Sequence, residues 1–123
     1  MTDHLEQNVD PCKVDRFVYD VELVRVIDGD TVVLDIDLGC DVWLKGEYCR
    51  LYGIDTPEVR GEERLVGLQA TAYLVSMTDD AEKFVVRTYK DKKGKYGRWL
   101  VTLMADGVNI NRKLVDDGYA REI

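Results

Sequence analysis

The sequence predicts an α+β fold, in which five strands form a barrel and two helices pack against it. Two observations carry this prediction. Apolar residues alternate with polar ones along several short segments that end in turn-forming residues, which is the period of a half-buried strand. Over residues 62–77 the apolar residues instead recur every three or four positions, which is the period of one helix face.

Three strands are predicted in the first half of the chain. Residues 17–27 alternate in polarity and end at the turn 28–30, and residues 31–37 pair back across that turn. Two glycines indicate a turn-rich connection over residues 38–46. A third strand over residues 47–54 ends before a proline, which cannot donate a hydrogen bond to a ladder.

The helix over residues 62–77 is expected to pack on the barrel. Its apolar face would comprise Leu65, Leu68, Ala72 and Val75, which are spaced three or four positions apart. Such a stripe normally faces the core, so these four side chains are expected to be buried.

Two further strands and a short helix complete the chain. Strands are predicted over residues 82–89 and 98–104, and the second helix is capped by Asn109 or Asn111 and ends before Gly118. Five short strands with a helix between the third and fourth follow the order of an OB-fold barrel. A small β-sandwich with a packed helix fits the same pattern and stays the alternative.

Length and composition indicate one folded domain. The chain has 123 residues, of which 46% are hydrophobic and 33% charged, and this balance excludes an intrinsically disordered chain. No apolar run approaches the ~18 residues that span a bilayer, so a transmembrane protein is excluded. Residues 1–15 lack periodicity and are expected to form a loose arm before a domain over residues 16–123.

The cysteines and the N-terminus favour a cytoplasmic protein. Acidic residues occupy the place where a secretory signal has a basic region, and no apolar stretch follows. Cys12, Cys40 and Cys49 are an odd number and form no CxxC pair, which indicates neither a disulfide framework nor a zinc site.

The charge is acidic overall but uneven along the chain. Its 17 Lys and Arg against 24 Asp and Glu give a net charge of −7, which by itself argues against a nucleic-acid partner. Between residues 83 and 98, however, seven basic residues face one acid, Asp91. The net charge therefore does not exclude a nucleic-acid substrate, and predicts weak, salt-dependent binding.

Four carboxylates lie at two predicted turns. Asp28 and Asp30 follow the first strand, and Asp55 and Glu58 follow the third. In a small barrel such turns can share one rim, where clustered carboxylates repel one another unless a hard cation such as Ca²⁺ neutralises them. Aspartate also favours turns for purely structural reasons, so both interpretations stay open here.

Two arginines lie in or beside apolar strand segments. Arg50 occupies the middle of the third strand, and Arg98 begins the fifth. A half-buried guanidinium needs an anionic partner, which could be a nearby Asp or a bound phosphate. Arginines together with clustered carboxylates form the set that metal-assisted phosphoryl transfer requires.

Five short strings occur in a fixed order from about Phe17 to Arg121. They are IDGDT at 27–31, RLYGIDTPE at 50–58, KYGR at 95–98, ADG at 105–107 and LVDDG at 114–118. In this order and spacing they resemble the staphylococcal nuclease (thermonuclease) family. The resemblance implies an OB-fold phosphodiesterase, an endonuclease that cuts DNA and RNA with Ca²⁺ and little sequence specificity and leaves 3′-phosphate ends.

The resemblance also implies a metal site. Asp30 and Asp55 would be carboxylate ligands of Ca²⁺, and the main-chain carbonyl of Thr56 would be a third ligand. Asp28 would act from the outer shell through water. Carboxylate and carbonyl oxygens are the ligands that a hard cation prefers.

Catalytic and substrate-binding roles follow from the same resemblance. Glu58 would be the general base or water-positioning group, because a carboxylate can accept a proton from water. Arg50 and Arg98 would bind phosphate oxygens and stabilise the transition state, with Arg98 nearer the leaving 5′-oxygen. Lys95 and Tyr96 would flank the bound phosphate.

Two other functions compete with a nuclease. One is an OB-fold module that binds nucleic acid or protein with little or no catalysis, and the other is an interaction domain that uses its acidic surface. The second leaves the two arginines unexplained. DNA and RNA are the expected partners, no membrane partner is expected, and the oligomeric state is left open, a homodimer included.

Overall fold

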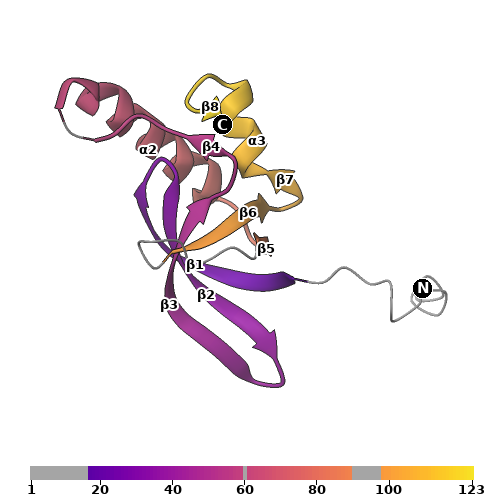
Figure 1. The fold of residues 1–123 in the computed structure, drawn as a ribbon. Coiled ribbons are helices and arrows are strands. Elements are labelled where there is room, and N and C mark those ends of the chain that lie inside the picture. Colours follow the sequence, from indigo (N-terminus) through magenta and orange to yellow (C-terminus); the bar gives the residue numbers. More distant parts are fainter. Residues whose placement is uncertain (1–16, 60, 90–97) are drawn as a thin grey trace.

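A closed β-barrel forms the body of the computed structural model, which describes residues 17–59, 61–89 and 98–123 (Figure 1). Its five strands run in the order β3-β2-β1-β5-β6, and β6 pairs back onto β3 to close the barrel. The closing pair is parallel and the other four pairs are antiparallel. The strands are β1 (Val18–Asp28), β2 (Thr31–Gly39), β3 (Val42–Leu51), β5 (Phe84–Tyr89) and β6 (Trp99–Ala105).

This closure confirms the predicted five-stranded OB-fold barrel and excludes the sandwich. Helix α2 (Arg64–Asp79) lies between the third and fourth barrel strands, after a short 3₁₀ turn (Gly61–Glu63). Helix α3 (Ile110–Asp116) follows the small strand β7 (Val108–Asn109). The predicted loose arm at residues 1–15 lies outside the described residues.

A second, two-stranded sheet joins the chain after β3 to the C-terminus. Strand β4 (Ile54–Asp55) pairs antiparallel with β8 (Arg121–Glu122). The N–H of Ile123 also donates to the carbonyl of Gly53 at 3.0 Å. The C-terminal residues therefore hold the segment that carries Asp55.

The core lies inside the barrel and continues under both helices. Alternate residues of β2 and β6 point inward, and α2 and α3 each add a leucine that is fully buried. Each such side chain contributes roughly 1.5–3 kcal/mol relative to an exposed position. Cys49 belongs to this core, and burial raises the pKa of its thiol to about 12, which keeps it protonated near neutral pH.

Two asparagines fix α3, one as its N-cap and the other as its anchor on the barrel. Of the two caps that the sequence predicted, Asn109 is the one observed. Its side chain accepts the N–H of Arg112. Asn111 is buried instead, and its amide accepts the N–H of Leu103 and donates to the carbonyls of Tyr52 and Val101, all at 3.0 Å. Asn111 therefore links the residue after β3 to β6 through hydrogen bonds.

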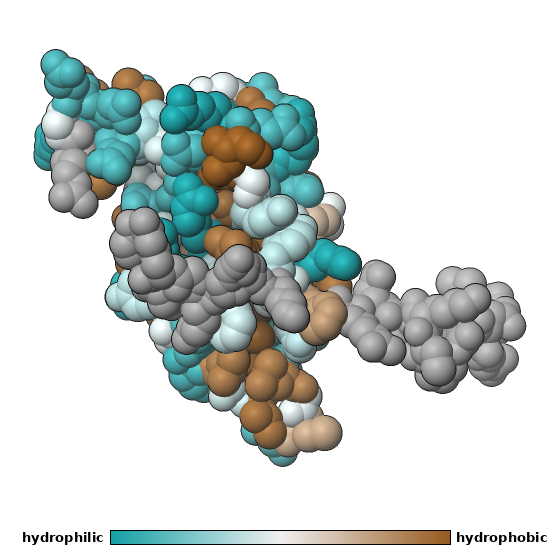
Figure 2. Space-filling model, viewed as in Figure 1, coloured by the Kyte–Doolittle hydropathy of each residue, from teal (hydrophilic) through white to brown (hydrophobic). Residues whose placement is uncertain are grey.

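The predicted connection over residues 38–46 is wrong, because β2 and β3 continue into a tight hairpin. Only Cys40 and Asp41 separate the strands, with φ angles of 54° and 65°. Positive φ at both central residues matches the right-handed twist of paired strands, although neither residue is glycine. The hairpin carries exposed apolar side chains, Leu38 and Val42 among them, and Figure 2 shows this hydrophobic surface.

Helix α2 buries a different face from the one predicted. Leu65 is 71% exposed, and Leu68, Ala72 and Val75 are exposed as well. The buried positions are Gly67, Ala70, Leu74 and Thr78. Most of these are small or polar, so the hydrophobic spacing of the sequence did not detect the face on which the helix packs.

The small residues let α2 approach the chain that leads out of β4. A Cβ atom added at Gly67 would lie 2.3 Å from the carbonyl oxygen of Glu58 and 2.8 Å from that of Pro57. At Gly29 it would lie 2.9 Å from the Cβ atom of Ala70. The helix thus packs directly on both turns that carry the predicted carboxylates. No helix in the described part of the chain is long and apolar enough to span a membrane.

Replacing Gly67 by Ala is expected to destabilise the protein, although alanine is the better helix former by about 1 kcal/mol. The added methyl group meets backbone atoms that cannot rotate away, and such overpacking costs roughly 1–3 kcal/mol. Urea denaturation measures the change, with the exposed Gln69→Ala as the control, expected within about 0.5 kcal/mol of wild type. A Gly67→Ala variant more stable than wild type would contradict this packing.

Candidate active site

Seven residues that the sequence analysis singled out line one cavity of about 570 Å³. They come from the β1–β2 turn, from β3 and the segment after it, and from the residue that precedes β6. The barrel and α2 therefore gather positions that are up to 70 residues apart in the chain. The seven are Asp28, Asp30, Arg50, Asp55, Thr56, Glu58 and Arg98.

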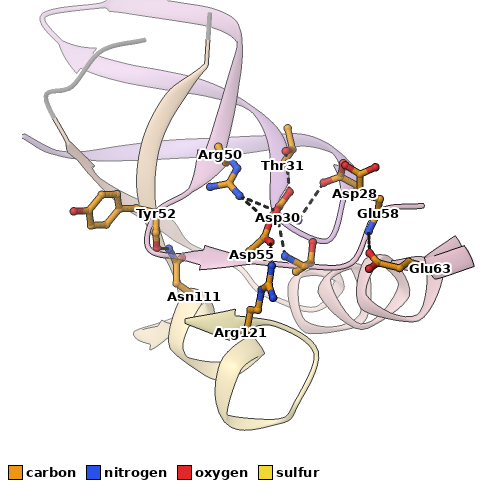
Figure 3. Close-up of polar contacts among 11 residues, drawn as sticks. Asp28, Asp30, Thr31, Arg50, Tyr52, Asp55, Glu58, Glu63, Asn111 and Arg121 are labelled. Carbon is orange, nitrogen blue, oxygen red and sulfur yellow. Dashed lines mark hydrogen bonds and ion pairs between the residues drawn. The ribbon is translucent and has the colours of Figure 1, made fainter. Parts of the chain in front are cut away.

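Asp30 lies at the centre of the polar network, and only 8% of it is exposed. Its Oδ1 accepts the hydroxyl of Thr31 at 3.2 Å, and its Oδ2 accepts the main-chain N–H of Thr56 at 3.3 Å (Figure 3). A buried carboxylate needs such partners, because desolvation penalises its charge. These bonds join the β1–β2 turn to the segment after β4.

Asp28 lies two residues earlier on the same turn. Its Oδ1 accepts the main-chain N–H of Asp30 at 3.1 Å, a local bond that shapes the turn. Burial, followed by the adjacent carboxyl group of Asp30, raises the pKa of Asp28 above its ordinary value. A nearby cation would oppose this shift.

Arg50 bridges the two carboxylates that the resemblance assigns to a metal. Its Nη2 lies 3.3 Å from Oδ2 of Asp30 and 3.2 Å from Oδ1 of Asp55. The Arg50 side chain is 20% exposed, so it is half-buried with anionic partners, as the sequence analysis required. Arg50 also lines the cavity.

Arg121 is a site residue that the sequence analysis did not assign. Its Nη2 lies 3.2 Å from Oδ2 of Asp55, so Asp55 sits between two guanidinium groups. The contact arises from the pairing of β8 with β4, in which Arg121 stands opposite Asp55. No sequence period marks a pairing of two-residue strands that are 66 positions apart.

Glu58 is exposed at the edge of the cavity, where solvent water can reach it. Its main-chain N–H donates to Oε1 of Glu63 at 3.2 Å, and Gly67 of α2 packs against its main-chain carbonyl. These two contacts fix the backbone of Glu58. Arg98 lines the same cavity.

The donor atoms of this cavity suit a hard cation. The candidate metal ligands that line the cavity are carboxylate oxygens. None of the lining residues is a histidine or cysteine, which softer metals prefer as ligands. Within the described residues, no group of three or more His, Cys, Asp or Glu side chains is arranged to hold a metal ion. Asp30 and Asp55 instead form ion pairs with Arg50. A cation that bound both carboxylates would therefore have to displace this guanidinium. Lys95 and Tyr96 lie outside the described residues.

Comparison with known proteins identifies the family. Residues 48–123, more than half of the chain, match the family model described as "Staphylococcal nuclease homologue". The chain belongs to the staphylococcal nuclease family. This confirms the resemblance stated from the five strings. The nucleases of the staphylococcal nuclease family are typically Ca²⁺-dependent.

Curated relatives include both nucleases and uncharacterized proteins. The thermonuclease of Staphylococcus hyicus is 31% identical over 103 residues, which cover 81% of this chain and 57% of that protein. The uncharacterized protein MJ1439 of Methanocaldococcus jannaschii is 30% identical, with the same two coverages. Endonuclease YhcR of Bacillus subtilis is 31% identical, covering 78% of this chain and 8% of YhcR. The chain thus spans just over half of the first two relatives and a small part of the third.

Replacing Arg50 by Met is expected to lower the free energy of unfolding by about 2–3 kcal/mol, because it leaves the buried carboxylate of Asp30 without its cationic partner. Urea denaturation in the presence of a chelator measures this change. The matched control is Arg121→Met, which breaks an ion pair whose arginine is 80% exposed and should cost less than about 1 kcal/mol.

Millimolar Ca²⁺ is expected to restore part of the stability that Arg50→Met loses, because a cation that binds only the folded state stabilises it. Equal losses in the two variants, or no effect of Ca²⁺ on Arg50→Met, would show that Asp30 does not depend on a neighbouring positive charge.

Proposed function

We propose that the protein is a Ca²⁺-dependent phosphodiesterase that hydrolyses DNA and RNA with little sequence specificity and leaves 3′-phosphate ends. The observation that carries the proposal is the single cavity lined by four acidic side chains and two arginines. Membership of a family that includes thermonucleases supports it.

The proposed metal ligands are the two carboxylates that Arg50 now bridges. Asp30 and Asp55 would bind Ca²⁺ directly together with the main-chain carbonyl of Thr56, and Asp28 would act through water. The cation, when bound, supplies positive charge that stabilises the developing charge on phosphate oxygens. Thr56 already donates its N–H to Asp30, so the segment that would present this carbonyl is fixed before any cation binds.

Glu58 would take the proton of the attacking water. Its exposed position at the cavity edge lets water reach it, and the hydrogen bond of its backbone to Glu63 holds it in place. The water oxygen would attack phosphorus, and the bond between phosphorus and the 5′-oxygen would break. The 5′-oxygen would leave as a hydroxyl group after taking a proton from solvent, and the phosphate would stay on the 3′-oxygen.

The two arginines would bind the phosphate. Guanidinium groups offer paired N–H donors that match phosphate oxygens and need no reorganisation as charge develops. Arg50 lines the cavity from β3, and Arg98 lines it from the residue before β6, with Arg98 proposed nearer the leaving 5′-oxygen. Lys95 and Tyr96, which would flank the phosphate, stay a prediction.

One observation favours a second candidate function, an OB-fold module that binds nucleic acid without catalysis. Arg50 holds both Asp30 and Asp55 as an internal ion-pair network, which satisfies these carboxylates without a cation. A module of this kind would use the arginines for phosphate binding and would have no use for Glu58. The two candidates therefore differ in what Glu58 does.

Replacing Glu58 by Gln is expected to lower the rate of DNA hydrolysis by roughly 10²- to 10⁴-fold, the usual contribution of a general base. The assay follows digestion of single- and double-stranded DNA with Ca²⁺ and with a chelator, which should abolish the activity. The matched control is Glu62→Gln, an exposed carboxylate of the neighbouring 3₁₀ turn that does not line the cavity. Equal rates for wild type and Glu58→Gln would refute the mechanism, and no hydrolysis with retained DNA binding would favour the binding module.

A further inference from the structure

Two arginines hold the carboxylate of Asp55, and they hold different oxygens. Nη2 of Arg50 lies 3.2 Å from Oδ1, and Nη2 of Arg121 lies 3.2 Å from Oδ2. In Figure 3 the two guanidinium groups approach Asp55 from opposite sides. Arg50 lines the cavity and Arg121 does not, so the role of Arg121 needs an explanation of its own.

The oxygen of Asp55 that Arg50 contacts is the one that converges with Asp30. Nη2 of Arg50 also lies 3.3 Å from Oδ2 of Asp30, so one oxygen of each carboxylate meets the same positive centre. Such convergence is what a cation site requires of its carboxylates. Because a carboxylate is planar, the bond of Arg121 to Oδ2 of Asp55 also fixes the direction of Oδ1.

The strand that carries Arg121 is fixed by its backbone. Arg121 stands opposite Asp55 in the pairing of β8 with β4, and the N–H of Ile123 donates to the carbonyl of Gly53 at 3.0 Å. Glu122, between them, pairs with an arginine of α3 at 3.4 Å. The guanidinium is therefore delivered to Asp55 by a paired strand, although the side chain of Arg121 is 80% exposed.

Helix α2 fixes the residues that precede β8. The ring of Tyr73 stacks on that of Tyr119, with centroids 4.1 Å apart and planes inclined by 21°, and its hydroxyl donates to Oδ2 of Asp117. The same helix packs on the chain that leads out of β4. One helix therefore contacts both the segment that follows Asp55 and the segment that precedes Arg121.

Orientation of Asp55 explains this arrangement better than stability does. An ion pair with so exposed an arginine contributes little to the stability of the fold. Hydrogen-bonded partners of metal-binding carboxylates, in contrast, hold the ligand in its binding orientation, and their loss typically lowers metal affinity by roughly 10- to 100-fold.

We propose that Arg121 is a positioning residue, which holds Oδ2 of Asp55 so that Oδ1 stays directed toward Asp30 and available to a divalent cation. The proposal rests on the proposed function, which assigns Asp30 and Asp55 to the cation. It adds that the C-terminal strand, through one side chain outside the cavity, determines how tightly that cation binds.

The charge of Arg121 has an effect of the opposite sign. A guanidinium repels a nearby cation, so removal of its charge alone would tighten cation binding. Solvent and salt screen this repulsion at a side chain that is 80% exposed, and we expect the orientation of Asp55 to outweigh it. The direction of the change in affinity therefore separates the two effects.

The test measures the binding of Ca²⁺ alone, from the rise of the thermal midpoint of the full chain with Ca²⁺ concentration. Arg121→Met removes the donors and the charge but keeps a long side chain, and is expected to weaken Ca²⁺ binding roughly 10-fold. Arg121→Lys keeps a donor for Asp55 and should recover most of this loss. The control Arg112→Met removes an exposed arginine that pairs with Asp116 and Glu122, and should bind Ca²⁺ as wild type does.

A second readout separates positioning from a loss of folded protein. In Arg121→Met, the Ca²⁺ concentration that gives half of the maximal rate of DNA hydrolysis should increase by the same factor as the dissociation constant, and added Ca²⁺ should raise the rate toward that of wild type. Partial unfolding would instead lower the rate at every Ca²⁺ concentration.

The outcomes distinguish this proposal from the nuclease proposal. Unchanged or tighter Ca²⁺ binding in Arg121→Met, or an equal loss in Arg112→Met, would overturn the positioning role and leave the nuclease proposal intact. Weaker binding in Arg121→Met alone, with no hydrolysis by wild type, would support the positioning role and refute the nuclease. No binding of Ca²⁺ by wild type would refute the metal assignment and the positioning role with it.

Discussion

The buried carboxylate of Asp30 is the constraint on which the rest of this site depends. A carboxyl group with 8% exposure must be matched by hydrogen-bond donors and positive charge, because its desolvation is otherwise too unfavourable for a small domain. Its partners are the hydroxyl of Thr31, the N–H of Thr56 and the guanidinium of Arg50. These groups come from β2, from the chain after β4 and from β3, so one charge fixes three segments relative to one another.

The same contacts connect stability with the proposed chemistry. Arg50 cannot give its Nη2 donors to Asp30 and Asp55 and also place them fully on a phosphate. A cation that takes over the two carboxylates would release the guanidinium toward the cavity. Metal binding and phosphate binding would then favour each other, because each removes a competitor of the other. The two ion pairs themselves explain why an arginine rather than an apolar residue is stable near the end of β3.

The sequence predicted features that depend on neighbouring residues, such as turns. It did not predict which side chains become buried or paired through contacts between distant segments. Asp28 and Asp30 follow one strand and precede another, so the turn that carries them could be predicted, together with the expectation that it can share a rim with the turn after β3. The face of α2 could not, because Gly67 and Thr78 are buried for their small size and not for their hydrophobicity. The contact of Arg121 with Asp55 depends on the pairing of β8 with β4, and no spacing along the chain records it.

The net charge of −7 limits the kinds of interaction by which this protein can bind a polyanion. Long-range attraction is weak or absent at this net charge, so affinity has to come from contacts at short range. A cation at the carboxylates and two guanidinium groups provide contacts of this kind. Phosphate contacts weaken steeply as salt increases. Added salt also screens the repulsion between the acidic surface and the polyanion, so the salt dependence of binding reports the balance of these two opposing effects.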